Sequence, residues 1–249
     1  MWTLAADAPV PLWRDDGDGT VVAAFSTRRG GVSAPPYDQL NLGRSTDDRP
    51  EAVEENRSRL LESLGLDSAR LATAGQVHGA QVVRVHAPGL HPSCDALLTT
   101  EPRLALAVSA ADCPPLIFQT PGAVAAAHAG WRGIAAGVPS ATLAALCATA
   151  TVEPGQVRVA IGPCIRSCCY DVGAEVAERF PAAAVSERDG RLWLDLPEAI
   201  RLQLLGAGLP ATALADTGAC TSCESSWYYS HRRDRGLTGR QWGLVALIA

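Results

Sequence analysis

Short apolar runs alternate with segments of helical periodicity along most of the chain. Apolar runs bounded by turn residues predict strands, and apolar residues that recur every three or four positions predict helices. Runs such as Leu104–Val108 and Val124–Ala127 lack polar alternation, which is typical of strands buried on both faces. Strands are predicted at Val21–Ser26 and at about 70–76, 81–86, 95–99, 104–109, 115–119, 123–128, 157–161, 191–195, 212–215 and 241–248.

The first predicted helix has clear signals at both ends. Asp48 is its expected N-cap, Pro50 lies near its first position, and Gly65 ends it. Its apolar stripe consists of Val53, Leu60, Leu61 and Leu64. Further helices are predicted at 134–148, 174–180 and 197–206. Because no linker or repeat interrupts this pattern, the sequence indicates one α+β domain over 1–249, in which helices cover mixed sheets.

Composition excludes several classes of function. A chain of 249 residues can bury a sizeable core. Its net charge of −5 argues against a nucleic-acid or membrane-surface binder. All basic residues are arginines, so lysine Schiff-base chemistry is excluded. Since neither a signal peptide nor a transmembrane run is evident, we expect a soluble cytoplasmic protein.

Three potential metal ligands, His78, Cys113 and His128, each lie where an apolar run gives way to a turn. Functional side chains are often held at such strand ends. Two imidazoles and one thiolate suit zinc, and three protein ligands leave a fourth position for water or substrate. The spacing also permits a cysteine nucleophile with a histidine base, or a buried thiol and hydrogen-bonded imidazoles that bind no metal.

Three arginines are candidates for binding an anion. Arg132 lies in His128–Gly133, where two glycines precede a predicted helix, and a helix N-terminus beside an arginine favours an anion. Arg28 lies next to a pair of glycines, and Arg57 lies on the first predicted helix. Each could instead be a solvated surface residue, although Trp131 and the glycines are unusual for an exposed helix start.

The chain has eight cysteines, which without a secretory signal are typical of thiols or metal ligands. Cys220 and Cys223 form a C-x-x-C segment, and Cys164, Cys168 and Cys169 could complete a second metal site with them. Because no second C-x-x-C segment accompanies the first, we expect these five residues to be ordinary buried thiols. We expect Trp227–Tyr229 to be a packed element and His231 an exposed polar residue.

A series of short motifs, in order along nearly the whole chain, resembles those of one family. They are Phe25–Ser33, Leu40–Gly43, Glu55–Arg57, Gln76–Gly79, Asp95–Ala96, Ala111–Pro114, His128–Gly133, Ile161–Pro163, Tyr170–Gly173 and Thr238–Arg240. The chain thereby resembles the laccase-domain or YfiH-like family, also called multicopper polyphenol oxidases, whose members are described as purine nucleoside phosphorylases.

The resemblance implies a four-layer α/β/β/α sandwich with zinc bound by His78, Cys113 and His128. It also implies phosphorolysis of adenosine, inosine, guanosine and methylthioadenosine, with adenosine deamination as a side activity. Two alternatives stay open. One is a cysteine hydrolase acting on an amide or a peptidoglycan precursor. The other is a copper phenol oxidase, although five histidines are few for a multinuclear copper cluster.

For such an activity, purine nucleosides and phosphate are the expected partners. Arg57, with Arg28, is predicted to bind the phosphate, because a guanidinium contacts phosphate oxygens in pairs. The metal would orient the nucleoside, or activate water for deamination. Gln76 and Asp112 are close to the ligands in sequence and are candidates for contacts with the substrate, as is Arg132.

Overall fold

The computed structural model describes residues 1–15, 17 and 19–248, and two β-sheets face each other at its centre. The seven-stranded sheet has the order β1 (Trp2–Ala5), β2 (Leu12–Asp15), β3 (Val21–Ser26), β16 (Gln241–Leu247), β8 (Ala105–Ala110), β4 (Leu71–Ala74) and β6 (Gly89–His91). The six-stranded sheet has the order β15 (Leu214–Asp216), β11 (Arg158–Ile161), β9 (Pro115–Thr120), β10 (Ala123–His128), β7 (Ala96–Thr99) and β5 (Val82–Arg84).

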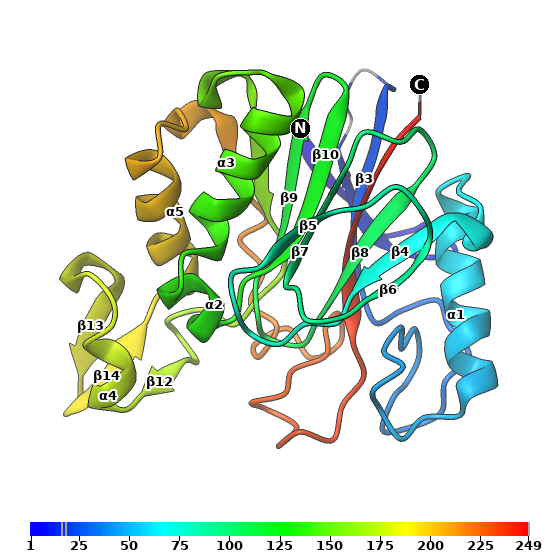
Figure 1. Cartoon of the computed structure of the whole chain (residues 1–249). Coiled ribbons are helices and arrows are strands. Elements are labelled where there is room, and N and C mark those ends of the chain that lie inside the picture. The colour runs from blue at the N-terminus through cyan, green and yellow to red at the C-terminus, as the bar shows by residue number, and fades with distance from the viewer. Residues whose placement is uncertain (16, 18, 249) are drawn as a thin grey trace.

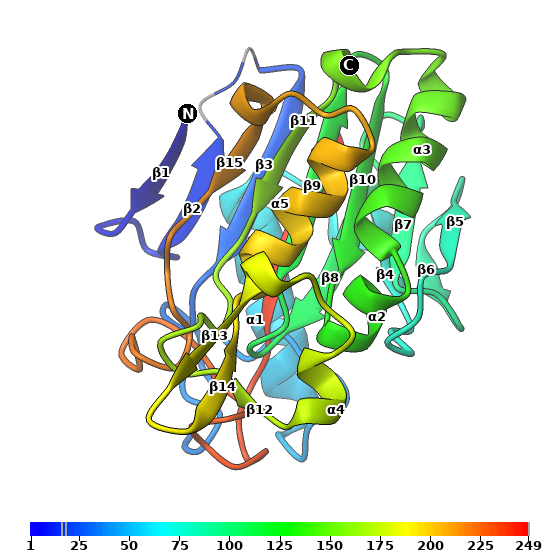
Figure 2. The same ribbon diagram turned by 90° about the vertical axis from the view of Figure 1, so that its left-hand side faces the viewer.

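Helices cover the outer faces of both sheets (Figure 1). On one side lies α1 (Pro50–Ser63); on the other lie α2 (Trp131–Ala135), α3 (Val138–Ala150) and α5 (Leu196–Gly206). Figure 2 shows α3 and α5 in front of the six-stranded sheet. Below them lie α4 (Ala174–Ala177) and a small sheet of β12 (Asp171–Val172), β14 (Arg191–Leu194) and β13 (Val185–Arg188). None of the described helices has the length and apolar character that a bilayer crossing requires.

Three apolar clusters fill the spaces between these four layers. Along β9 successive side chains point to opposite faces, so Leu116 and Phe118 pack towards α3 and α5 while Ile117 packs towards the other sheet. Along β16, Leu244 packs towards α1 and Val245 packs between the sheets. Both sheets are therefore buried on both faces, which explains the unalternated apolar runs. The expected four-layer α/β/β/α sandwich is confirmed.

The predicted helix at 134–148 is in fact two helices. The first ends at Ala135, and α3 begins at Val138. Between them Gly137 has a φ of +89°, a conformation that glycine adopts without the steric cost that other residues incur. Pro139, in the first turn of α3, lacks the N–H that would continue a helix from the preceding turn.

The expected cap of the first helix is also wrong. Arg49, not Asp48, is the N-cap residue of α1, and it makes no capping side-chain hydrogen bond. The Asp48 carboxylate instead accepts hydrogen bonds from Ser33 Oγ at 2.6 Å and from Asn41 Nδ2 at 2.9 Å. It therefore holds together the two loops that precede the helix.

Five strands were missed, namely β1, β2, β6, β12 and β13. The first two are four-residue strands at one edge of the large sheet, and they carry exposed polar residues such as Thr3 and Arg14. Short edge strands bury few side chains, so their sequences carry little of the apolar signal on which the prediction depended.

Ile117 tests the packing between the two sheets. Its side chain is 0% exposed. We expect Ile117→Ala to lower the free energy of unfolding by about 2–5 kcal/mol, through lost burial and a residual cavity. Leu237, which is 57% exposed, is the control, and Leu237→Ala should change stability by less than about 0.5 kcal/mol. Urea unfolding measures both, and equal effects would contradict the assigned layers.

Candidate metal and active site

The three predicted ligands converge at one end of the two sheets. His78 follows β4, Cys113 lies between β8 and β9, and His128 is the last residue of β10. One donor atom from each lies within 4.8 Å of the others. The imidazole rings of His78 and His128 meet edge to face, with centroids 4.8 Å apart. Chain segments 50 residues apart in sequence thus supply one cluster of donors.

The residues present fit a transition-metal ion. Two imidazoles and one thiol form a three-residue donor set typical of zinc sites with an open coordination position. Gly130 makes room for them, since a Cβ there would lie 3.0 Å from both Cys113 Sγ and His78 Cδ2. His128 is buried at the base of the cluster, whereas His78 is exposed. The cluster is therefore open to solvent on one side.

A buried carboxylate that sequence reasoning gave no role, Asp95, positions both imidazoles. It is 0% exposed and lies 2.9 Å from His128 Nδ1. It also accepts hydrogen bonds from the backbone N–H groups of Val77, His78 and Gly79, at 3.2, 2.9 and 2.7 Å. Such outer contacts fix the ring orientation of ligating histidines. The motif Asp95–Ala96 marked this position in the sequence, but only the folded structure shows which groups the Asp95 carboxylate contacts.

The thiol and imidazole of Cys113 and His128 shift each other's pKa. Burial alone raises the pKa of Cys113, but the facing His128 and His78 outweigh burial and lower this pKa to about 6. Burial likewise lowers the pKa of His128, but the charge on Cys113 and the hydrogen bond to Asp95 raise this pKa to about 9. Without a metal, the pair is therefore thiolate and imidazolium at neutral pH.

The cluster opens into a cleft of about 800 Å³ with a strongly basic lining. Arginines line it from several sides, namely Arg44, Arg57, Arg132, Arg232 and Arg240. Tyr170 and His231 add two rings to the wall nearest Arg232. His231 is exposed, as expected, but its place on the cleft wall was not predicted. Such a lining favours a ligand that carries both negative charge and an aromatic or heterocyclic face.

Arg57 is buried and Arg240 is half-buried, and neither has full compensation of its charge. Arg57 donates two hydrogen bonds to Leu42 O, at 2.9 and 2.7 Å, and stacks on Trp242. Burial, together with repulsion from Arg44, lowers the pKa of Arg57 to about 10. Burial also lowers the pKa of Arg240. An anion bound between them would relieve this cost, because it would pair with charges already removed from water.

Gln76 and Asp112 line the cleft, but their polar atoms are bonded to the protein. The Gln76 amide bonds to the backbone N–H and C=O of Ser109, at 2.8 and 2.6 Å. The Asp112 carboxylate accepts hydrogen bonds from the Thr221 hydroxyl and from the backbone N–H of Arg232, both at 2.6 Å. Both residues therefore position the segments around the ligands, and Asp112 does so next to Cys113.

Arg28 lies outside the cleft lining, whereas Arg132 lies within it. The Arg28 guanidinium donates to Asp38 O at 2.7 Å and to Ser225 O at 2.9 Å, and it pairs with the Asp38 carboxylate at 3.2 Å. It therefore holds two loops together and does not reach the cleft. Arg132 lines the cleft and stacks on Trp131, with its Cζ 4.2 Å from the ring centroid.

Comparisons with known proteins agree on one family. The family model described as multi-copper polyphenol oxidoreductase laccase matches residues 22–248. A purine nucleoside phosphorylase of Deinococcus radiodurans is 43% identical over 230 residues, which cover 90% of this chain and 88% of that protein. The purine nucleoside phosphorylase YfiH of Escherichia coli is 37% identical, covering 96% and 98%. The crystal structure of Bacillus licheniformis YfiH matches with a TM-score of 0.92 at 33% identity, covering 98% of each chain.

The contacts of Asp95 predict a specific loss of metal affinity. Asp95→Asn removes the negative charge that faces His128 and one acceptor for the 77–79 loop, so we expect metal affinity to fall about 10- to 100-fold. Competition with a chromophoric chelator measures it. Asp67→Asn is the matched control, because Asp67 caps a short 3₁₀ helix, a role that asparagine performs equally well. Equal affinity in both variants would refute the positioning role.

The pKa of Cys113 predicts how metal-free protein reacts with iodoacetamide. A thiolate reacts and a thiol does not, so alkylation of Cys113 should be half-maximal near pH 6 and stay high above it. Cys147 is the internal control, because burial raises its pKa and its alkylation should begin only at higher pH. Peptide mass spectrometry separates the two sites, and a common midpoint would contradict the thiolate–imidazolium pair.

Proposed function

This chain belongs to the family described as multi-copper polyphenol oxidoreductase laccases, and we propose that it is a zinc-dependent purine nucleoside phosphorylase. Its substrates would be adenosine, inosine, guanosine and methylthioadenosine, with phosphate as co-substrate and adenosine deamination as a second activity. One observation carries the proposal: the His78–Cys113–His128 cluster opens into a cleft that is lined by several arginines, of which Arg57 is buried and incompletely compensated.

The arginines of the cleft would bind the phosphate co-substrate. In phosphorolysis a phosphate oxygen bonds to ribose C1′ while the C1′–N9 bond breaks, and the bonding pair leaves with the purine, which takes up a proton. Arg57 keeps one terminal nitrogen free of its bonds to Leu42, and Arg44 and Arg240 line the same cleft. Guanidinium groups in this arrangement would hold the phosphate dianion and fix its direction of attack.

Other residues of the cleft lining would bind the nucleoside. Tyr170 lies in the lining beside the metal ligands, and Arg232 stacks on its ring with Cζ 4.8 Å from the centroid. Burial and the negative charge of Cys113 raise the pKa of Tyr170 to about 12, so the phenol keeps its proton at neutral pH. Its ring would stack on the purine, while its hydroxyl stays a hydrogen-bond donor.

Zinc is proposed because of the donor set. His78, Cys113 and His128 would hold it, and when bound it would act as a Lewis acid towards substrate or water. A multinuclear copper oxidase needs more imidazoles than this cluster contains. His86 instead lies 2.8 Å from the Glu101 carboxylate, and His91 lies 3.3 Å from Ala87 O. Copper at the single site remains the alternative that metal reconstitution tests.

A cysteine hydrolase acting on an amide or a peptidoglycan precursor is the second candidate. The observation that favours it is the chain of contacts from Cys113 to His128 to Asp95, with a lowered thiol pKa and a raised imidazole pKa. Nucleophilic cysteine enzymes use the same order of groups. The two candidates differ in one requirement, since the hydrolase needs a free thiolate and the phosphorylase needs a bound metal.

The test uses inosine with and without inorganic phosphate. We expect hypoxanthine and ribose 1-phosphate only when phosphate is present, loss of turnover after chelation, and recovery with zinc rather than copper. Full phosphorolysis by stripped protein would remove the metal from the proposal. Amide hydrolysis by stripped protein that alkylation of Cys113 abolishes would favour the hydrolase.

Arg57→Gln tests the phosphate half within the same assay. Losing a charged hydrogen bond of roughly 1.5–3 kcal/mol should raise the KM for phosphate about 10- to 100-fold and change the KM for inosine less. Arg59→Gln is the matched control, because Arg59 lies on the same helix but pairs with Glu55 at the surface. Thermal unfolding checks that both variants fold, and an unchanged KM for phosphate in folded Arg57→Gln would exclude Arg57.

A further inference from the structure

Four cysteines outside the cleft form a second cluster of sulfur atoms. Cys168 and Cys169 lie in the turn that follows β11, and Cys220 and Cys223 lie in the loop between β15 and β16. All four sulfurs lie within 4.8 Å of one another. The expectation of buried thiols holds for Cys220 but is wrong for Cys168 and Cys223, which are exposed. One C-x-x-C segment is enough to form this cluster, because the consecutive Cys168 and Cys169 supply the other two sulfur atoms.

The spacing of these sulfurs matches a tetrahedral metal site. Cys168 Sγ lies 3.7, 3.6 and 3.6 Å from the sulfurs of Cys169, Cys220 and Cys223, and Cys169 Sγ lies 3.3 Å from Cys223 Sγ. Ligands about 2.3 Å from a tetrahedral zinc ion are about 3.8 Å apart. We propose that Cys168, Cys169, Cys220 and Cys223 bind a second, structural zinc ion.

The backbone around Cys220 supports this assignment. The Cys220–Cys223 segment is closed by hydrogen bonds to the residue that follows it. The Glu224 N–H donates to Cys220 O at 3.0 Å, and the Cys220 N–H donates to Glu224 Oε1 at 2.9 Å. This tight turn holds the two cysteines of the C-x-x-C segment close together. Four coordinating residues also close the site, as in structural rather than catalytic zinc sites.

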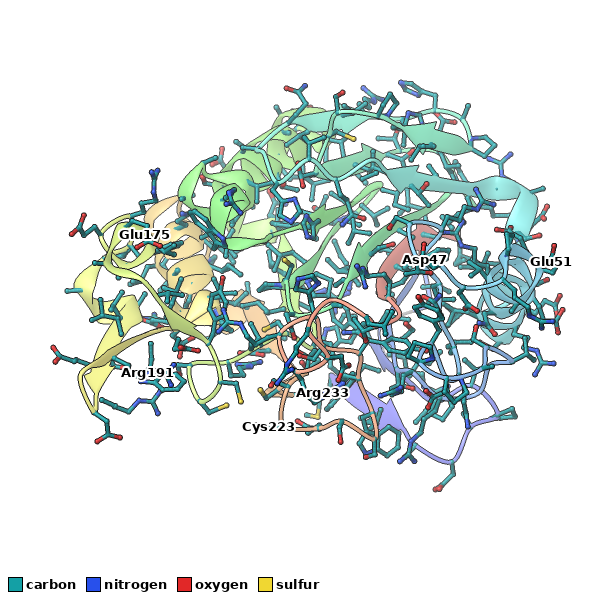
Figure 3. All side chains as sticks on the ribbon, turned by 90° about the horizontal axis from the view of Figure 1, so that it is seen from below. Asp47, Glu51, Glu175, Arg191, Cys223 and Arg233 are labelled. Atoms are coloured by element: carbon teal, nitrogen blue, oxygen red, sulfur yellow. The ribbon has the colours of Figure 1, made fainter. Side chains whose placement is uncertain are left out.

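Nearby arginines balance the charge that such a site carries. Four thiolates and one Zn²⁺ have a net charge of −2, and the two loops that hold them are contacted by guanidinium groups. Arg188 donates to Ser167 O, beside Cys168. Arg233 donates to Thr221 O at 2.6 Å, between Cys220 and Cys223. Figure 3 shows Cys223 and Arg233 on the same loop, seen from below.

Cys164 is close in sequence but is not a ligand. Its backbone forms a bridge with Cys220, and its O accepts from the Thr221 N–H at 3.0 Å. The side chain is buried in the core beneath α5, and burial raises its thiol pKa far above the usual range. It therefore aligns the two loops through backbone contacts while its sulfur stays within the apolar core.

The proposed ion would fasten one wall of the cleft. Cys169 immediately precedes Tyr170, and the loop that carries Cys220 and Cys223 continues to His231 and Arg232, all three in the cleft lining. Thr221, within the C-x-x-C segment, donates to Asp112, which precedes the ligand Cys113. The second zinc would thus hold in place the residues that face the first, without touching substrate.

The first experiment uses unaltered protein, expressed with zinc and purified without chelator under reducing, oxygen-free conditions. Elemental analysis should give two zinc equivalents per chain. Brief iodoacetamide treatment should spare Cys168 and Cys223 although both are exposed, and chelation should make them reactive. Immediate alkylation of these residues in metal-loaded protein, or a disulfide between Cys169 and Cys223 in peptides from it, would overturn the proposal.

Variants then separate the two sites. Cys113→Ala should keep one zinc, and X-ray absorption should show this ion with four sulfur ligands at about 2.3 Å. Cys169→Ser and Cys223→Ser should each lose one equivalent and unfold at lower temperature, whereas Cys147→Ser should keep both equivalents. A Cys113→Ala protein without zinc, or with zinc bound by nitrogen and oxygen, contradicts the four-cysteine site. Neither result depends on nucleoside turnover, so the proposed enzymatic function is tested separately.

Discussion

The buried carboxylate of Asp95 is the contact on which the rest of the site depends. It faces His128 Nδ1 and accepts hydrogen bonds from three backbone N–H groups of the loop that carries His78, so one negative charge positions two candidate ligands from different sheets. A buried charge is tolerated only when such donors surround it, and each donor left unpaired by its loss costs about 1–3 kcal/mol. The His78 loop is thereby held against the end of β10.

Charged side chains line the cleft both at the His78–Cys113–His128 cluster and around Arg57. At the His78–Cys113–His128 cluster, the thiolate of Cys113 and the imidazolium of His128 compensate each other's charge. Elsewhere in the lining, Arg57 is buried and Arg240 is half-buried, and carbonyl groups are their hydrogen-bond acceptors in the described part of the chain; burial lowers the pKa of both groups. The four-layer core makes both possible, because strands buried on both faces form a rigid support for side chains that leave their ends.

The proposed second zinc would support the part of the cleft that is formed by a loop without regular structure. The loop between β15 and β16 has no helix and no strand along residues 217–240, yet it supplies His231, Arg232 and Arg240 to the lining. In place of strands, turns and single backbone contacts hold this loop, such as the hydrogen bond from Thr221 N–H to Cys164 O at 3.0 Å. Its hydrogen bonds to Asp112, its arginine contacts and the four-cysteine cluster supply the order that regular structure supplies elsewhere.

By itself the sequence indicated strands buried on both faces and three candidate ligands, because both leave a local signal: runs such as Val124–Ala127 lack polar positions, and His78, Cys113 and His128 lie at strand ends inside short motifs. The four-layer arrangement and the zinc site were implied by the resemblance of those motifs to one family. Only the tertiary structure decided which polar partners these residues have. Three contacts join segments far apart in the chain: the one between Asp95 and His128, the one between Arg28 and Ser225, and the clustering of Cys168 and Cys169 with Cys220 and Cys223. Hydrogen bonds and metal coordination act over a few ångströms, and no periodicity in the sequence records which distant segments folding brings within that range.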